Sequence, residues 1–232
     1  MKKLAQQADR YELYEESVQN VEFEVSFYKK MFKRSTNRDA VSLREDFCAS
    51  AKISVEWVKK SPFTKAYAVD LDKKVLDYAK NISSNDLTSE QKKRLHLTYG
   101  DSLNYMSPKV DIVSACNFSY WVFKTRDKLK KYFKNTYKCL KNDGLFILDA
   151  FGGYEAHQEL EERTKHKNFT YVWDQHSFNP VTNDLTCFIH FEFKDKSRIN
   201  RAFKYEWRLW SLMEIKECLN ESGFGSVDFF MQ

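Results

Sequence analysis

The sequence contains little glycine and proline. Only 6 of its 232 residues are glycine and 3 are proline, whereas the two together make up about 12% of an ordinary protein. All six glycines lie at or after Gly100, so the first 99 residues contain none. This excludes a P-loop and a G-x-G-x-x-G phosphate turn from the N-terminal part, because both need glycine. Collagen-like, glycine/serine-rich and proline-rich chains are excluded as well.

The sequence also lacks a long apolar run and a cysteine pattern. No window approaches the ~18 apolar residues of a membrane span. The N-terminal stretch MKKLAQQADRYELYEES has no apolar segment after its two lysines and therefore predicts no signal peptide. The five cysteines are widely spaced without a C-x-x-C, and the five histidines show no ligand spacing with them. We expect a reduced, cytoplasmic protein without a metal site.

The composition that remains is that of a globular protein. Hydrophobic residues make up 42% and aromatic residues 16%, which is enough apolar material for a core in one large domain. The net charge of +5 is spread along the chain. Such a surplus favours anionic small molecules or weak nucleic-acid contact and specifies neither.

Strand-like and helical apolar patterns alternate along the first 150 residues. Helices are predicted at Asp9–Phe32, after Phe47, at Lys73–Ile82 and at Thr125–Leu140, with a left-handed cap at Asn142-Asp143-Gly144. Strands are predicted between them, at Ala40–Leu43, Ala66–Val69, Leu95–Tyr99, Val110–Ala115 and Leu145–Leu148. The alternation is typical of an α/β protein with a doubly wound, mostly parallel, Rossmann-like sheet.

The pattern changes after residue 150. Antiparallel strands are predicted at Tyr171–Ser177, Leu185–Phe193 and Ile199–Glu206, followed by a helix from Ser211 to Ser222 and one apolar strand at Val227–Met231. We therefore predict a single domain of four parts. These are an N-terminal helical lid at 1–36, a cofactor-binding core at 37–150, an antiparallel elaboration at 165–208, and the last helix and strand at 209–232.

Polar residues stand at the end of every predicted parallel strand. They are Glu45-Asp46, Asp70, Asp101, Asn117 and Asp149. Ligands of open parallel sheets bind at the carboxyl ends of the strands. An acid after the second strand can accept both hydroxyls of a ribose, and one after the third can accept from an exocyclic amine such as that of adenine. Turns favour aspartate for structural reasons too, but three acids in register predict a bound ligand.

Several runs together resemble the class I S-adenosylmethionine-dependent methyltransferases. LREDFCASA is preceded by DRYELYEESVQ and followed by AVDLD, and it is most similar to a bacterial subgroup whose first motif is LREDFCGTA or similar. The resemblance continues through YGD, DIVSACNFSYW, FILDAFGG and WRLWSLMEIKECLNESGF, which together span most of the chain. It implies S-adenosyl-L-methionine as the cofactor and methyl transfer as the reaction.

The resemblance also implies roles for individual residues. Glu45 takes the acidic position of the first motif, Asp70 holds the ribose, and Asp101 meets the adenine amine. Arg44 neutralises a carboxylate, either that of Glu45 or that of the cofactor. The implied cofactor-binding residues are Tyr14, Arg44, Glu45, Phe47, Cys48, Ala49, Asp70, Leu71, Asp101, Ser102, Asn117 and Phe118.

The first motif departs from the general family pattern at three glycine positions, which here hold Phe47, Ala49 and Ala51. Phenylalanine is usual in the subgroup, whereas the alanines are not. Alanine lets a ligand approach the backbone but resists positive φ. If both alanines have negative φ, only a methyl group is added and cofactor binding is retained. A non-catalytic homologue with a degenerate cofactor loop, serving as a binding or scaffold protein, is the alternative to an enzyme.

Methyl transfer depends more on positioning than on acid–base chemistry. The methyl group must meet a nucleophile in line at about 3–3.5 Å, in a site that excludes water. A neutral amine needs no general base, whereas a hydroxyl or carbon acceptor would use one, and the sequence assigns no catalytic residue. We expect a small-molecule acceptor beside Asn117 and five aromatic residues that equally suit core packing: Tyr11, Tyr120, Trp121, Tyr154 and Trp210.

Three further expectations concern alternatives and the C-terminal segment. The glycine-free first turn disfavours a nicotinamide oxidoreductase. The run NFSYW differs from the NPPY-like run of nucleobase amino-group methylation, which argues against a nucleic-acid acceptor without excluding it. Methyltransferases of this fold end with a strand pair, whereas only Val227–Met231 remains here. Either the chain is truncated, or a strand of the antiparallel segment fills the gap.

Overall fold

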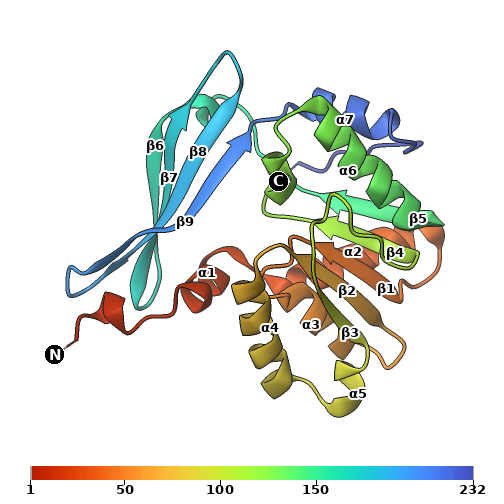
Figure 1. The fold of residues 1–232 in the computed structure, drawn as a ribbon, viewed down its shortest axis with the longest axis horizontal. Coiled ribbons are helices and arrows are strands. Elements are labelled where there is room, and N and C mark those ends of the chain that lie inside the picture. The colour runs from red at the N-terminus through yellow and green to blue at the C-terminus, as the bar shows by residue number, and fades with distance from the viewer. Residues whose placement is uncertain (1, 232) are drawn as a thin grey trace. The chain divides into compact units, whose positions relative to one another are not determined.

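A computed structural model of the protein describes residues 2–231. The chain divides into two compact units, whose two sheets are drawn in Figure 1. The parallel unit contains Asn20–Tyr120, Thr125–Ala150 and the residues from Met213 on. The antiparallel unit contains the residues up to Gln19, together with Trp121–Lys124 and Phe151–Leu212.

The parallel unit is built on a five-stranded sheet. Its strands are β1 (Ser42–Asp46), β2 (Lys65–Asp70), β3 (Leu95–Tyr99), β4 (Val110–Ala115) and β5 (Leu140–Leu148). They lie in the order β3-β2-β1-β4-β5, and every neighbouring pair is parallel. Every residue of β4 is buried, as expected for an inner strand with both faces covered. The strand order reverses between β1 and β4, which confirms the predicted doubly wound sheet.

Helices cover both faces of this sheet. On one face, α2 (Val21–Thr36) and α3 (Lys52–Lys59) join β1 in a buried cluster that includes Phe32, Trp57 and Leu43, and α4 (Lys73–Asp86) packs on the same face. On the other face, α6 (Arg126–Cys139) packs Tyr132 against Phe146 of β5. Two further helices are α5 (Ser89–Lys92) and α7 (Leu212–Asn220). None of the helices within residues 2–231 has the length and apolarity needed to cross a membrane.

Two predicted helix boundaries are wrong. The N-terminal helix is two helices, α1 (Arg10–Val18) and α2, because Asn20 caps α2 by accepting a hydrogen bond from the Phe23 N–H at 3.3 Å. The expected left-handed cap at Asn142-Asp143-Gly144 is absent, since Leu140 directly after α6 already has extended backbone and begins β5. The fifth strand is therefore longer than its apolar residues suggest.

The antiparallel unit is built on a four-stranded sheet. Its strands are β6 (Leu160–Lys165), β7 (Phe169–Phe178), β8 (Asp184–Phe193) and β9 (Arg198–Arg208), in that order. The last three confirm the predicted strands. β6 was not predicted, because its sequence LEERTK has no alternation of apolar residues. Five of its six residues are exposed, as an edge strand allows. α1 lies against the sheet, where Leu13 joins Phe169 and Phe191 in a small core.

The predicted last strand is wrong. Residues 227–231 form no strand. Ring contacts are made instead by Phe224, just before this segment, and by Phe230 within it. Phe224 stacks on Phe146 of β5 with centroids 5.7 Å apart, and Phe230 meets Phe27 of α2 at 6.3 Å. The explanation that an antiparallel strand fills the gap is also wrong. Within residues 2–231, β6–β9 form their own sheet and β5 is an edge strand.

Asp111 of β4 fixes the amino-terminal edge of the parallel sheet. Its buried carboxylate accepts from the backbone N–H groups of Val41 and Ser42 at 2.9 Å and from the Ser42 hydroxyl at 2.8 Å. Arg38 and Lys141 pair with its other oxygen at 2.7 and 2.9 Å. Burial opposes ionisation, but these hydrogen bonds and ion pairs outweigh it and lower the pKa of Asp111 to about 2.

We predict that Asp111→Ala lowers the free energy of unfolding by about 2–3 kcal/mol, because two amides and two cations lose their acceptor. The stabilisation by this carboxylate is present above pH ~4 and disappears as the pH falls through about 2, since the folded pKa lies below the unfolded one. Urea unfolding at neutral pH and pH 3 measures both effects. The control Asp143→Ala removes an exposed partner of Arg38 and should cost less than about 1 kcal/mol. Equal losses in the two variants would contradict the prediction.

Candidate functional site

The loop between β1 and α3 has the backbone of a glycine-rich turn without a glycine. Phe47, Ala49 and Ala51 have φ angles of 54°, 45° and 56°, all in the left-handed region. These are the three positions at which the family pattern has glycine. The two alanines therefore do not have the negative φ under which only a methyl group would be added. The loop instead has the backbone conformation that glycine would adopt.

Hydrogen bonds hold this loop against its strain. The Cys48 N–H donates to the Val69 carbonyl at 3.0 Å, and the Ala51 N–H donates to the Cys48 carbonyl at 2.6 Å. The Ala49 N–H donates to Oδ2 of Asp70 at 2.8 Å. A left-handed non-glycine residue costs about 1–3 kcal/mol, and such strain gathers at ligand sites. Burial raises the pKa of the Cys48 thiol well above its usual value, as expected of an apolar filler and not of a nucleophile.

Glu45 lies on the face of β1 that meets α3. Its Oε2 accepts from the Ser54 N–H at 2.9 Å and from the Ser54 hydroxyl at 2.5 Å. Ser54 is in the first turn of α3, whose N-cap residue, Ala51, has no polar side chain. Glu45 thus satisfies a helix amide that the N-cap cannot. Burial raises the pKa of Glu45 to about 8, and the two bonds from Ser54 limit the rise.

Arg44 and Asp46 form a buried ion pair on the opposite face of β1. Nε and Nη2 of Arg44 donate to the two Asp46 oxygens at 2.7 and 3.1 Å, and the Tyr132 hydroxyl donates to Asp46 at 2.8 Å. Burial raises the pKa of Asp46, while Arg44 and Tyr132 act to lower it. The carboxylate that Arg44 neutralises is therefore Asp46, and the expected pairing with Glu45 is wrong. β1 side chains alternate between faces, which separates neighbours 44 and 45.

Asp70 ends β2, directly opposite Tyr99 at the end of β3. Its Oδ1 accepts from the Asp72 N–H at 2.8 Å, while Oδ2 holds Ala49. Burial raises the pKa of Asp70, and its backbone hydrogen bonds oppose the rise. The next residue, Leu71, is 65% exposed. A carboxylate has about four acceptor sites, so Asp70 has the capacity for a further donor such as a hydroxyl.

The loop after β3 is tied together by Asp101. Its Oδ1 accepts from the Leu103 N–H at 2.9 Å, and its Oδ2 accepts from the Asn104 side chain at 3.4 Å. Its carbonyl accepts from the N–H groups of Asn104 and Tyr105 at 2.9 and 2.8 Å. Ser102 is buried within this turn. The structure thus places the acids of β2 and β3 at the ends of neighbouring strands.

The turn after β4 contains two more left-handed residues, Asn117 and Phe118, with φ of 56° and 55°. Their N–H groups donate to the two oxygens of Asp149 at 2.7 and 2.9 Å. Burial raises the pKa of Asp149 to about 6, although both amides act to lower it. Asp149 was predicted only as a polar residue at a strand end. Nothing in the sequence indicates that its carboxylate binds the backbone of the turn after β4.

The predicted acceptor residues are distributed over both units. Tyr120 belongs to the parallel unit, where its buried hydroxyl donates to the Asp149 carbonyl at 2.8 Å. Trp121 and Trp210 are buried in the antiparallel unit, and the Arg208 guanidinium lies 3.8 Å from the centre of the Trp210 ring. Tyr154, in the same unit, is 81% exposed. Core packing therefore accounts for three of these rings.

Tyr11 and Tyr14 project from α1 onto the antiparallel sheet. Their rings lie 6.0 and 5.0 Å from that of Phe203. The same face of the sheet continues into a row of half-buried and buried rings. Tyr205 stacks on Trp207 with centroids 4.4 Å apart, and Trp173 lies 6.1 Å from Trp207. This aromatic face of β7–β9 did not stand out in the sequence because its residues come from different strands.

A carboxylate–histidine cluster of Glu161, Asp174 and His190 lies on the antiparallel sheet. Nε2 of His190 is 3.1 Å from Oδ2 of Asp174, and Nδ1 accepts from the Arg201 N–H at 2.9 Å. Because Nδ1 is an acceptor, the neutral ring carries its proton on Nε2 and donates it to Asp174. A metal ion at Nε2 would displace that proton. The geometry therefore fits a structural pair and not a ligand set.

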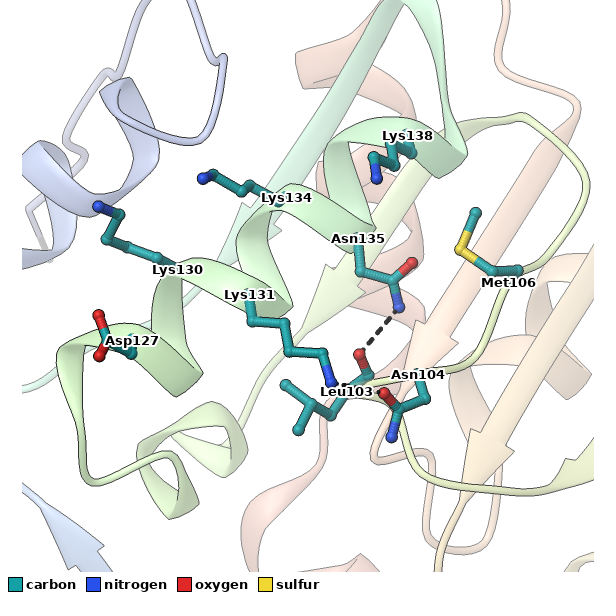
Figure 2. A pocket seen from close by; sticks show the side chains of 9 residues that line it. All are labelled: Leu103, Asn104, Met106, Asp127, Lys130, Lys131, Lys134, Asn135 and Lys138. Carbon is teal, nitrogen blue, oxygen red and sulfur yellow. Dashed lines mark hydrogen bonds between the residues drawn. The ribbon is translucent and has the colours of Figure 1, made fainter.

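A cavity of about 510 Å³ is lined by residues of α6 and of the loop after β3. Figure 2 shows the side chains that line it. Four lysines of α6 line it: Lys130, Lys131, Lys134 and Lys138. Lys130 pairs with Glu221 at 2.6 Å, and Lys131 donates to Asn104 at 2.9 Å. Figure 2 shows that the Lys130 and Lys131 side chains point in different directions. The ammonium groups do not converge, so this cavity is not an anion site of the kind that recognises a phosphate.

Comparison with known proteins supports the class of this fold. Residues 23–178 match the family model of the spermine/spermidine synthase domain. The chain belongs to this family. A putative methyltransferase of Bacillus subtilis (strain 168), YqeM, is 22% identical over 185 residues, which cover 76% of this chain and 70% of that protein.

Two solved structures show the same fold. An S-adenosylmethionine-dependent methyltransferase from Clostridium acetobutylicum ATCC 824 has a TM-score of 0.72 at 21% identity, covering 91% of this chain and 85% of that one. CalS10, an amino pentose methyltransferase from Micromonospora echinaspora with bound SAM, has a TM-score of 0.71 at 12% identity, covering 93% and 89%. The predicted class I S-adenosylmethionine-dependent methyltransferase fold is confirmed, including its antiparallel elaboration.

The strained loop leads to a prediction about stability. Ala49→Gly and Ala51→Gly should each raise the free energy of unfolding by about 0.5–1 kcal/mol, because relief of left-handed strain exceeds the entropy that glycine adds to the unfolded chain. Urea unfolding measures this change. The matched control is Ala68→Gly in β2, which is buried in a strand and should destabilise the protein. Destabilisation by both loop variants would contradict the left-handed conformation.

The raised pKa of Glu45 leads to a prediction about pH. Its folded pKa of about 8 exceeds the usual value of 4.5, so its contribution to stability is greatest below pH ~4.5 and falls as the pH rises toward 8. Glu45→Gln should therefore be more stable than the wild type at pH 8 by about 1–3 kcal/mol and nearly equal to it at pH 5. Glu22→Gln, an exposed change on α2, is the control. A difference that does not grow with pH would refute the assignment.

Proposed function

We propose that the protein is an S-adenosylmethionine-dependent methyltransferase that methylates a small-molecule acceptor. The observation that carries the proposal is the loop after β1. It keeps left-handed backbone at Phe47, Ala49 and Ala51, and Ala49 is bonded to the Asp70 carboxylate. Backbone strain of this kind clusters at ligand sites, and here three such residues fall within one loop of five.

The residues present fit the cofactor. Asp70 and Asp101 supply acceptors at neighbouring strand ends, suited to ribose hydroxyls and to the adenine amine, with the Ser102 backbone beside the latter. The loop with Phe47, Cys48 and Ala49 suits the methionine part, together with the turn at Asn117. When bound, S-adenosylmethionine supplies an electrophilic methyl group. The chain's own contribution is to bind, orient and exclude water.

We further propose that the acceptor nucleophile is an amine. No histidine lies at the ends of the five parallel strands, since His96 sits within β3 and the other four histidines belong to the antiparallel unit. The Asp149 carboxylate accepts from two backbone amides of the turn after β4, and hydrogen bonds to the ionised form act to lower its basicity. A neutral amine needs no general base. The name of CalS10, an amino pentose methyltransferase, supports the same class of acceptor.

The antiparallel unit has, by itself, a surface of a kind that binds small ring compounds. Its aromatic face, including Trp173 and Tyr205, offers flat ring surfaces and hydroxyl groups. Tyr11 and Tyr14 of α1 extend this surface. Aromatic rings suit both the apolar face of a small ring compound and a cationic amine.

The proposal is tested by calorimetry with S-adenosylmethionine and by product mass analysis with an amine panel. We expect binding in the micromolar range, and at least a tenfold loss of affinity in Asp70→Asn, because a charge-assisted hydrogen bond contributes about 1.5–3 kcal/mol. Asp86→Asn at the end of α4 is the control and should bind like the wild type. Absence of both heat and thermal shift at saturating cofactor would refute the enzyme and leave the binding or scaffold alternative.

A further inference from the structure

Asn135 of α6 is a buried amide that holds the loop after β3. It is 8% exposed, and its Nδ2 lies 3.3 Å from the carbonyl oxygens of Ser102 and Leu103 and 2.9 Å from that of Tyr105. Figure 2 shows the side chain directed from α6 at the Leu103 carbonyl. One amide nitrogen carries two protons, which three carbonyls share here. One side chain therefore holds three carbonyls of the turn at 102–105.

Arg44 binds the same turn from the sheet. Its Nη2 donates to the Ser102 carbonyl at 3.4 Å, and its guanidinium lies 5.0 Å from the centre of the Tyr105 ring. Arg44 is itself held by its two bonds to Asp46. The Ser102 carbonyl thus receives donors from two elements of the core, β1 and α6, although it belongs to a loop.

Asn135 and Arg44 each bury one polar atom that makes no hydrogen bond within the described part of the chain. Oδ1 of Asn135 and Nη1 of Arg44 are buried without a hydrogen-bond partner among residues 2–231. A buried polar atom without a partner is destabilising, and an apolar side chain of the same size avoids it. Stability alone therefore does not explain an amide at position 135. The N–H groups of Asn135 explain the amide, because they donate to backbone carbonyls between Asp101 and Tyr105.

We propose that Asn135, with Arg44 beside it, is a positioning residue for recognition of the adenine amine. It touches the loop and not the cofactor. By fixing the carbonyls of residues 102, 103 and 105, it holds the turn in which Asp101 aims its carboxylate and Ser102 its backbone N–H. The inference rests on the proposed function, because it assigns the cofactor's adenine end to this turn. Displacement of such groups by about 1 Å is enough to lose most of their effect.

The test compares two ligands in the full chain. The probes are S-adenosylhomocysteine and its 6-oxo analogue, in which oxygen replaces the adenine amine, and calorimetry gives the ratio of their dissociation constants. The wild type should prefer the amine about ten- to hundredfold, as expected for a hydrogen bond to a carboxylate. Asn135→Leu should reduce that ratio at least fivefold. Asn135→Ser serves the same purpose if the leucine variant does not fold.

The matched control is Lys134→Ala on the same helix. Lys134 directly precedes Asn135 and is exposed, so the ratio of this variant should equal that of the wild type. A ratio that persists in the Asn135 variants while both affinities fall equally would overturn the inference and make Asn135 merely structural. A collapse of the ratio in Lys134→Ala, or a wild type that binds both ligands equally, would overturn it too. A wild type that binds neither ligand refutes the proposed function itself.

Discussion

The hydrogen bond from the Ala49 amide to the Asp70 carboxylate joins the two features on which the candidate site depends. It fixes the loop after β1 in left-handed backbone, and it fixes the acid at the end of β2. The Cys48 amide bonds β2 as well, through the Val69 carbonyl. The neighbouring strand therefore helps to shape the turn, together with the turn's own bond from the Ala51 N–H to the Cys48 carbonyl. This explains how alanine occupies positions that glycine would fill without strain.

β1 shows how the same strand serves two sides of the sheet. Its sequence SLRED contains three charged residues in succession, and all three are buried. Alternation sends Arg44 and Asp46 to the face of α6 and Glu45 to the face of α3. On one face the charges neutralise each other with help from Tyr132. On the other face, Glu45 has the uncharged Ser54 as its hydrogen-bond partner, and burial raises its pKa to about 8.

The parts of the fold that were predictable are those with a local signal. Five parallel strands and their helices follow from apolar periodicity, and the ends of β3 and β4 agree to the residue with their predicted limits. β6 has no such signal, since an exposed edge strand needs no apolar face. Val227–Met231 has the signal but no partner strand, and a strand requires a neighbour to exist. Without a partner strand within residues 2–231, its apolar residues Phe229, Phe230 and Met231 stay exposed.

The residues of the candidate site also differ in whether the sequence carries a local signal for them. Asp70 and Asp101 were predictable because a strand end and an acid are both readable in the sequence. Asp149 was predicted as an acid at a strand end but without its partners, and neither Ser54 nor Asn135 was predicted. Asn135 reaches the turn at 102–105, 30 or more positions away in the chain. Of the two partners predicted for Arg44, Glu45 was wrong because neighbours in a strand face opposite ways. Acids at strand ends are thus visible from the sequence, whereas the residues that hold their loops depend on packing and require the fold.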